Sequence, residues 1–170
     1  LGFVERGGAR LAPISVCPVL TPQMQAALGA LQTLAGAFTP ARGDITLQCL
    51  WTDTGLDVAI KGAGRGGNLD RAGLEAAAAA AEAADVARLS LDGATVVTRR
   101  IPALRMGAAI VRPPPGAFLQ PTAFGEQILA ELAQQALAGA QRVVDLVSGI
   151  GTFALRLAQT AEVQAVESEA

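Results

Sequence analysis

The chain has 170 residues, about half of them apolar, and its 13 basic and 15 acidic side chains give a net charge of −2. This length and apolar content exclude a disordered chain and allow one domain or slightly more. No apolar stretch reaches the roughly 18 residues of a membrane span, and two cysteines, Cys17 and Cys49, are too few for a disulfide framework. We therefore expect a cytoplasmic protein with no membrane partner. Because the chain opens at Leu1 rather than Met, we also expect it to belong to something longer.

The first 40 residues predict two short strands and a helix. The strands are Phe3–Arg6 and Arg10–Ile14, joined by a turn at Gly7-Gly8. Thr21-Pro22 is a strong helix start, because a capping hydroxyl precedes a proline at the first helical position. Apolar residues then recur every three or four positions until Pro40. They are Met24, Leu28, Leu31, Leu34 and Phe38.

The next segment predicts a hairpin, a helix and three strands. Apolar residues alternate with others over Ile45–Trp51, and the alternation resumes over Leu56–Ile60 after a turn. This pattern indicates a hairpin with one buried face. Cys49 follows this alternation, so we expect it in the core. An alanine-rich helix is expected at Leu69–Ala84. Strands are then expected at Val86–Leu91, Ala94–Arg99 and Leu104–Val111. Residues 1–112 thus predict an α+β domain dominated by antiparallel pairing.

A run of prolines and a glycine, Pro113–Gly116, marks the predicted domain boundary. Residues 1–112 hold eleven basic and nine acidic side chains, whereas residues 113–170 hold two and six. In this second part Thr122 is expected to cap a helix that ends at Gly139, with one apolar face. That face consists of Ile128, Leu129, Leu132 and Ala136.

A strand, a helix and a second strand follow within about 25 residues, which is typical of the βαβ unit of a parallel sheet. They are expected at Val143–Val147, Gly149–Gln159 and Val163–Glu167. A glycine-rich turn after the first strand lets a ligand approach the backbone, and an acid after the second strand can accept hydrogen bonds from ribose hydroxyls. S-adenosylmethionine (SAM) and NAD share these needs. Asp145 favours SAM, because a carboxylate suits its positively charged sulfonium and amino end.

A second glycine run competes with this one. Gly62–Gly67 fits G-x-G-x-x-G between a strand and a helix, with Asp85 further on. Its preceding strand, however, looks like the second arm of an antiparallel hairpin, whereas a dinucleotide site needs a parallel βαβ unit. We therefore interpret the run as a connecting loop.

Two separated groups of motifs resemble one family. Pro114–Gln120, the helix containing Glu126, Val144–Leu146 and Gly149–Phe153 together resemble the 23S rRNA uracil-5 methyltransferases. The Gly2-Phe3 strand and Cys17–Leu20, which enters a helix, are similar to the central domain of these enzymes. The implied fold is of the α/β class: an α+β central domain at 1–112, followed by the opening of a Rossmann-like SAM-dependent methyltransferase domain at 113–170.

The resemblance also implies site residues. Gln120, Val147, Thr152 and Glu167 would line the SAM site with Asp145, while Gly149 and Gly151 would give backbone access. These cofactor-binding positions all lie in the second predicted domain. The chain departs from the family at Thr122, where Asn is usual, and at Val147, where an aromatic residue is common.

Other parts of the family's machinery fall outside the chain. Cys17 would be the last of four cysteine ligands to a four-iron four-sulfur cluster, and the other three are not among these residues. The nucleophilic cysteine and the proton-abstracting glutamate of the family would also lie elsewhere. The chain alone is therefore expected to be inactive, with no catalytic residue of its own.

The implied reaction is methyl transfer from SAM to carbon 5 of a uridine in RNA, with 23S rRNA as the expected partner. The alternatives are a noncatalytic RNA-binding module, a tRNA uracil-5 methyltransferase or another class of SAM methyltransferase. Arg99, Arg100, Arg105 and Arg112 could contact RNA phosphates, and solvated strand edges explain them equally well. A short parallel sheet would also expose apolar edges, so we expect self-association or pairing with a neighbouring chain.

Overall fold

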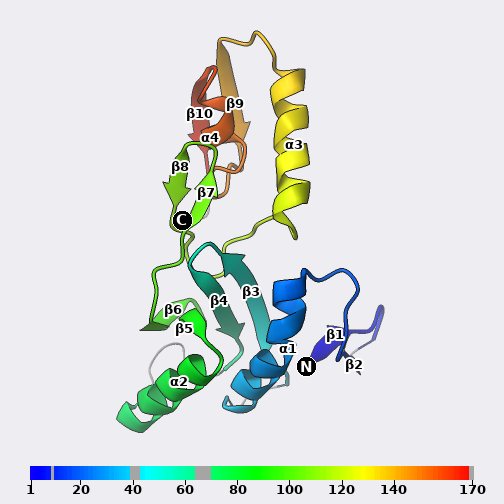
Figure 1. Cartoon of the computed structure of the whole chain (residues 1–170), viewed down its shortest axis with the longest axis vertical. Helices are drawn as coiled ribbons and strands as arrows, with labels where there is room; N and C mark the ends of the chain where they lie inside the picture. The colour runs from blue at the N-terminus through cyan, green and yellow to red at the C-terminus, as the bar shows by residue number, and fades with distance from the viewer. Residues whose placement is uncertain (9, 39–42, 64–69, 169–170) are drawn as a thin grey trace. The chain divides into compact units, whose positions relative to one another are not determined.

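The computed structural model describes residues 1–8, 10–38, 43–63 and 70–168. It is a mixed α/β structure (Figure 1) in two compact units, Leu1–Pro102 and Ala103–Ala170. The first unit contains, in chain order, β1 (Gly2–Val4), β2 (Leu11–Pro13), α1 (Pro22–Gly36), β3 (Thr46–Thr52), β4 (Gly55–Lys61), α2 (Arg71–Ala83), β5 (Val86–Leu91) and β6 (Ala94–Thr98). The second contains β7 (Leu104–Met106), β8 (Ala109–Val111), α3 (Ala123–Ala136), β9 (Arg142–Leu146), α4 (Ala154–Leu157) and β10 (Glu162–Val166).

The division between the units lies ten residues before the expected boundary at 112/113. The run expected as one strand at 104–111 is a hairpin of β7 and β8 that turns at Gly107. A Cβ at Gly107 would lie 2.4 Å from the Gln159 side chain just beyond α4, so this hairpin packs within the second unit. The assignment of functional domains to 1–112 and 113–170 stays a prediction.

The first unit is built on a four-stranded sheet in the order β3-β4-β5-β6. Antiparallel pairs join β3 to β4 and β5 to β6, but β4 and β5 are parallel and are connected through α2. Strand β4 therefore does not belong only to the predicted hairpin: it lies inside the sheet with two neighbours, of which the sequence pattern indicated only β3. β4, α2 and β5 form a parallel βαβ unit.

Helices α1 and α2 supply one side of the core of this unit. Leu31 and Leu34 of α1 and the alanines of α2 pack against apolar residues of β4 and β5. The sheet residues in this cluster are Leu56, Val58, Ile60, Val86, Leu89 and Leu91. Small alanine side chains allow a helix to lie close to a sheet, which accounts for the alanine-rich run. Cys49 packs against the same cluster, as predicted, whereas Trp51 near the end of β3 is 44% exposed.

One ion pair is buried between the neighbouring strands β4 and β5. Arg88 Nε and Nη2 donate to the two carboxylate oxygens of Asp57 at 2.9 and 2.6 Å, and the side chains are 12% and 3% exposed. Such a bidentate pair is stable only because each charge has its partner. Desolvation, followed by repulsion from Asp57, raises the pKa of the nearby Cys49 thiol to about 12.

The second unit contains the predicted parallel pair. β9 and β10 are in register from Arg142 opposite Glu162 to Leu146 opposite Val166. The helix between them is shorter than expected, since α4 covers only Ala154–Leu157 and turns occupy the residues before it.

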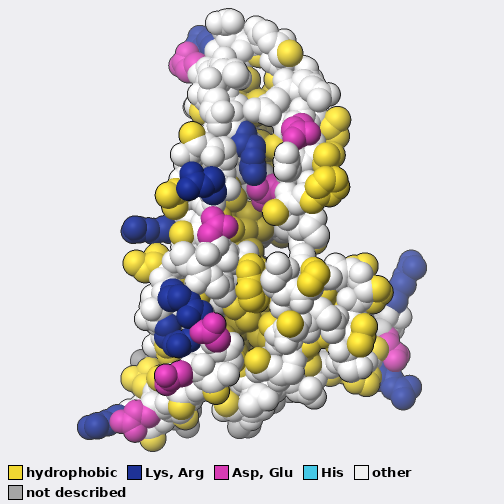
Figure 2. All heavy atoms as spheres, in the orientation of Figure 1, with side chains coloured by type: hydrophobic (Ala, Val, Ile, Leu, Met, Phe, Trp, Pro, Cys, Tyr) yellow, Lys and Arg dark blue, Asp and Glu magenta, His cyan; other side chains and the backbone are white. Residues whose placement is uncertain are grey.

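Helix α3 begins as predicted, with the Thr122 hydroxyl accepting the Gly125 amide at 3.0 Å. This cap gives Thr122 a structural role at the position where the family resemblance would place Asn. The buried residues of α3 are Glu126 and Ala130. The expected apolar face is exposed: Ile128 by 40%, Leu129 by 42% and Leu132 by 55%. Hydrophobic side chains gather along α3 in Figure 2. Within the described residues, none of the helices is both long and apolar enough to cross a membrane.

Candidate cofactor-binding bend

The chain leaves β9 through a bend that requires unusual backbone conformations. Val147, Gly149 and Gly151 have φ values of +59°, +56° and +92°. Glycine adopts this left-handed region without steric cost, whereas a β-branched valine is strained there. A Cβ at Gly149 would meet nothing within 4 Å, so the backbone at this residue is open to a ligand. At Gly151 a Cβ would lie 2.9 Å from the Leu155 side chain, so glycine is needed there for packing.

The carboxylate of Glu167 lies directly at this bend. It follows β10, and its Oε2 accepts the Gly149 amide at 2.6 Å while Oε1 accepts the Ser168 amide at 2.8 Å. The Ser148 amide also donates to the carbonyl of Val166, at 3.0 Å. These two backbone donors orient the carboxylate at the bend.

Two further side chains, Asp145 and Arg156, hold the other side of the bend. Asp145 Oδ2 accepts the Ala154 amide at 3.1 Å, which joins β9 to the first residue of α4. Arg156 Nη1 donates to the carbonyl of Thr152 at 2.6 Å, and Arg156 Nη2 pairs with Glu126 Oε1 at 2.7 Å. Arg156 is not among the residues predicted from the sequence. Its partner lies 30 residues earlier, and no local pattern signals a pair at that separation.

Six of the seven predicted cofactor positions therefore belong to one structural feature. Asp145, Val147, Gly149, Gly151 and Thr152 lie in or beside the bend, and Glu167 is hydrogen-bonded to it. Gln120 is half-buried in the segment before α3, and no hydrogen bond joins it to the bend among the residues that the structure describes.

Cys17, the predicted cluster ligand, lies in the first unit. It is a free, half-buried cysteine whose amide donates to Gln25 Oε1 at 2.8 Å, and the Gln25 Nε2 donates to the carbonyl of Ser15 at 3.0 Å. In the described ranges no three His, Cys, Asp or Glu residues are grouped so that they could hold a metal ion.

The competing glycine run lies mostly outside the described residues, since 64–69 are not among them. Gly62 is described, and its amide donates to Asp92 Oδ1 at 2.7 Å. Asp92 follows β5, whereas Asp85, the acid that the sequence suggested for a dinucleotide, precedes that strand. Asp85 therefore lies at the opposite end of β5 from the position that a ribose-binding acid would occupy.

Asp85 is instead bound by two arginines. Arg99 Nη1 and Arg100 Nη1 contact its Oδ1 at 2.9 and 2.8 Å, and Arg100 also donates to the carbonyls of Asp85 and Thr54. Hydrogen bonds from Arg100 and then Arg99 hold the pKa of Asp85 below its usual range. These contacts favour a structural role for Arg99 and Arg100 over binding of RNA phosphates.

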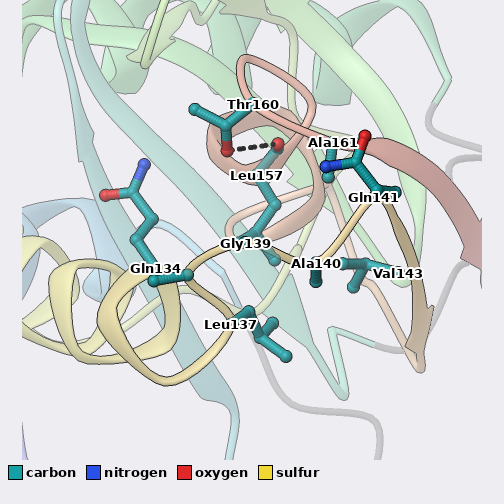
Figure 3. A pocket seen from close by; sticks show the side chains of 10 residues that line it. Gln134, Leu137, Gly139, Ala140, Gln141, Val143, Leu157, Thr160 and Ala161 are labelled. Carbon is teal, nitrogen blue, oxygen red and sulfur yellow. Dashed lines mark hydrogen bonds between the residues drawn. The ribbon is translucent and has the colours of Figure 1, made fainter.

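A cavity of about 310 Å³ lies near the other end of β9, where α3 leads into the strand (Figure 3). It is lined by the end of α3, the residues before β9 and the segment after α4, including Gln134, Gly139, Gln141 and Thr160. None of the predicted cofactor residues lines it. We therefore assign the candidate site to the bend.

The residues at the bend fit a nucleoside cofactor such as SAM. An adenosine at the carboxyl edge of a parallel strand pair needs open backbone and a nearby carboxylate. Gly149 provides the open backbone, and the Glu167 carboxylate lies 2.6 Å from the Gly149 amide. Asp145 adds a second carboxylate, half-buried, on the β9 side of the bend.

Comparison with known proteins finds relatives along the whole chain. It is 43% identical to an uncharacterized RNA methyltransferase of Caulobacter vibrioides and 38% identical to ones of Brucella suis and Mesorhizobium japonicum. Each match covers all of this chain but only 41%, 40% and 40% of the respective relatives, so the chain spans about two fifths of their length. No family model matches. The chain is thus homologous to uncharacterized RNA methyltransferases.

Proposed function

We propose that this chain forms the cofactor-binding part of a SAM-dependent RNA methyltransferase that methylates carbon 5 of a uridine, with 23S rRNA as substrate. The homology to RNA methyltransferases supports the general activity. The contact of 2.6 Å between Glu167 and the Gly149 amide is the observation that carries the cofactor assignment. The motifs at Pro114–Gln120 and Cys17-Pro18 favour the uracil-5 class and rRNA.

In this proposal the chain binds and orients the cofactor. Glu167 accepts hydrogen bonds from the ribose hydroxyls, the bend at Gly149 accommodates the adenosine, and Asp145 faces the positively charged end. Val147, Thr152 and Gln120 complete the wall of the site, and residues 113–170 open a Rossmann-like domain. SAM would supply an electrophilic methyl group. The nucleophilic cysteine that adds to carbon 6 of the uracil, and the general base, would lie outside this chain.

The test is calorimetric titration of SAM into the complete gene product. We expect Glu167→Gln to weaken binding by about 10- to 100-fold, because a hydrogen bond to a charged group is lost. Gly149→Val should abolish binding, since a β-branched residue at φ +56° is strained and fills the open space.

The chain provides a matched control. Asp92 accepts the amide of Gly62 after β5 in the same way that Glu167 accepts the amide of Gly149 after β10. Asp92→Asn should therefore leave SAM affinity unchanged. The site assignment would be removed if Asp92→Asn and Glu167→Gln lost SAM affinity equally, or if Gly149→Val bound SAM as the parent does.

The substrate is tested separately. Loss of one 5-methyluridine from 23S rRNA in a deletion strain, and its return on complementation, is the expected result. A loss confined to tRNA would point to the tRNA class. Retained SAM binding in vitro with no change in any RNA would contradict the uridine assignment while leaving the cofactor site intact.

A further inference from the structure

Arg156 connects the candidate site to helix α3 through two different nitrogens. Nη2 contacts Glu126 Oε1 at 2.7 Å and Nη1 contacts the Thr152 carbonyl at 2.6 Å. The Arg156 and Glu126 side chains are only 16% and 11% exposed, so solvent screens this pair weakly. One guanidinium therefore joins a helix that precedes β9 to a peptide group that follows it.

The Thr152 carbonyl depends on this contact. In a regular helix it would accept the amide of Arg156, four residues later, but that amide bonds to the Phe153 carbonyl at 3.1 Å. The Arg156 side chain takes the place of the missing backbone donor. It thereby holds the peptide between Thr152 and Phe153, directly after Gly151 with its left-handed φ of +92°, in one orientation.

Helix α3 supports Arg156 at a second point. Gln134 lies two turns beyond Glu126 on the same helix face, and its Nε2 donates to the Arg156 carbonyl at 3.4 Å. Ala130, between them on that face, is 3% exposed, which allows α4 to approach closely. The side of α3 that faces α4 is thus polar at both ends, although the helix has an apolar face of leucines and isoleucine elsewhere.

Burying the Arg156–Glu126 ion pair between α4 and α3 requires the removal of water from two charges, which opposes the gain from their attraction. Apolar side chains of similar size are often as good or better for stability, whereas a charged pair with fixed geometry can specify one arrangement. Here the arrangement being specified includes the Thr152 peptide of the bend.

We propose that Arg156, held by Glu126, is a positioning residue for the cofactor: it fixes the bend from Gly151 to Thr152 in the conformation that accepts SAM. This inference relies on the proposed function and assigns to it a residue outside the cofactor wall. A purely structural pair would affect folding, and it would affect cofactor affinity only through folding.

Arg156→Lys separates these two roles. Lysine keeps the positive charge that Glu126 needs, but its single nitrogen cannot occupy both positions that Nη1 and Nη2 of the planar guanidinium take beside the Thr152 carbonyl and the Glu126 carboxylate. In the complete gene product we expect this variant to keep most of the thermal stability and to bind SAM about tenfold more weakly in calorimetry. Glu126→Gln, which keeps an oxygen for Arg156, should fall between this variant and the parent in SAM affinity.

The Arg88–Asp57 pair of the first unit is the matched control, with side chains 12% and 3% exposed. Arg88→Lys should lower the thermal midpoint and leave SAM affinity unchanged. The inference is overturned if Arg156→Lys binds SAM as the parent does, or if both lysine variants lose affinity in proportion to their loss of stability. Absence of SAM binding by the parent itself would instead overturn the proposed function, and this inference with it.

Discussion

Replacing Val147 by glycine should cost the protein almost nothing in stability, although removal of a valine side chain usually destabilises. The left-handed conformation at φ +59° costs an L-residue about 1–2 kcal/mol, which glycine avoids. Full burial of a valine stabilises by about 1.5–3 kcal/mol. Val147 is 79% exposed, so the lost burial amounts to about 0.3–0.6 kcal/mol. Glycine also gives the unfolded chain more conformational freedom than valine, which lowers the stability of the variant by a further ~0.4–1 kcal/mol. The balance lies within about 1 kcal/mol of zero.

The comparison is Leu146→Gly, one residue earlier in β9. Leu146 is 69% exposed, but strand geometry needs no glycine, so relief of strain cannot offset the loss. We expect this control to be about 1–2 kcal/mol less stable than the parent. Urea unfolding followed by circular dichroism measures both variants. Trp51, the only tryptophan, lies in the first unit, so its fluorescence reports that unit separately.

The reasoning fails if Val147→Gly destabilises as much as Leu146→Gly, because the left-handed valine would then carry no strain. Strain of this kind persists where function requires it. If the Val147 side chain contacts the cofactor as proposed, the same variant should weaken SAM binding while its unfolding free energy stays nearly constant.

Three further outcomes follow from the first unit. Iodoacetamide at pH 8 should modify Cys17 in the folded chain and reach Cys49 only on unfolding, because burial raises the pKa of Cys49 to about 12; mass spectrometry of the peptides checks this, and early Cys49 labelling would contradict it. Hydrogen bonds from Arg100 and then Arg99 lower the pKa of Asp85. The resulting stabilisation of the fold is fully present at pH values above the ordinary pKa of 3.8, and it is lost as the pH falls through the lower pKa of the folded state. Asp85→Asn should therefore show a shallower loss of stability with acid in thermal melts, and an unchanged slope would refute it. Asp57→Ala should cost about 3–5 kcal/mol in urea unfolding, since it removes the carboxylate that pairs with the buried Arg88 guanidinium; a loss below about 1 kcal/mol, as is usual for a surface substitution, would refute it.

Local signals predicted the elements well wherever the residues that decide the structure lie close together. The caps at Thr21 and Thr122, the β3–β4 hairpin and the parallel β9–β10 pair all follow from patterns within about 25 residues. The contact between Gly149 and Glu167 could be anticipated for the same reason, since a parallel βαβ unit brings the ends of its two strands to one edge.

The features that the sequence did not predict depend on long-range pairing. The antiparallel pairing that was expected to dominate the unit is present, but the parallel pairing of β4 with β5, which follow one another through α2, is invisible in the alternation of either strand. Arg156 carries no motif, and its role appears only when α3 places Glu126 beside it. Helix α4 is shorter than its sequence pattern because the left-handed residues of the bend extend as far as Gly151.

The pairing of β9 with β10 leaves each strand one outer edge within the described residues. In a parallel arrangement these two edges are different surfaces. Contact between the β9 edge of one copy and the β10 edge of the next would be head-to-tail, whereas contact of two copies through the same edge would close into a symmetric dimer. Val144 and Leu146 add exposed apolar surface on β9, at 59% and 69%, so we expect association of this chain to increase with concentration. A polar substitution at Val144 should therefore weaken the contact between copies, and light scattering should then report smaller assemblies at the same concentration.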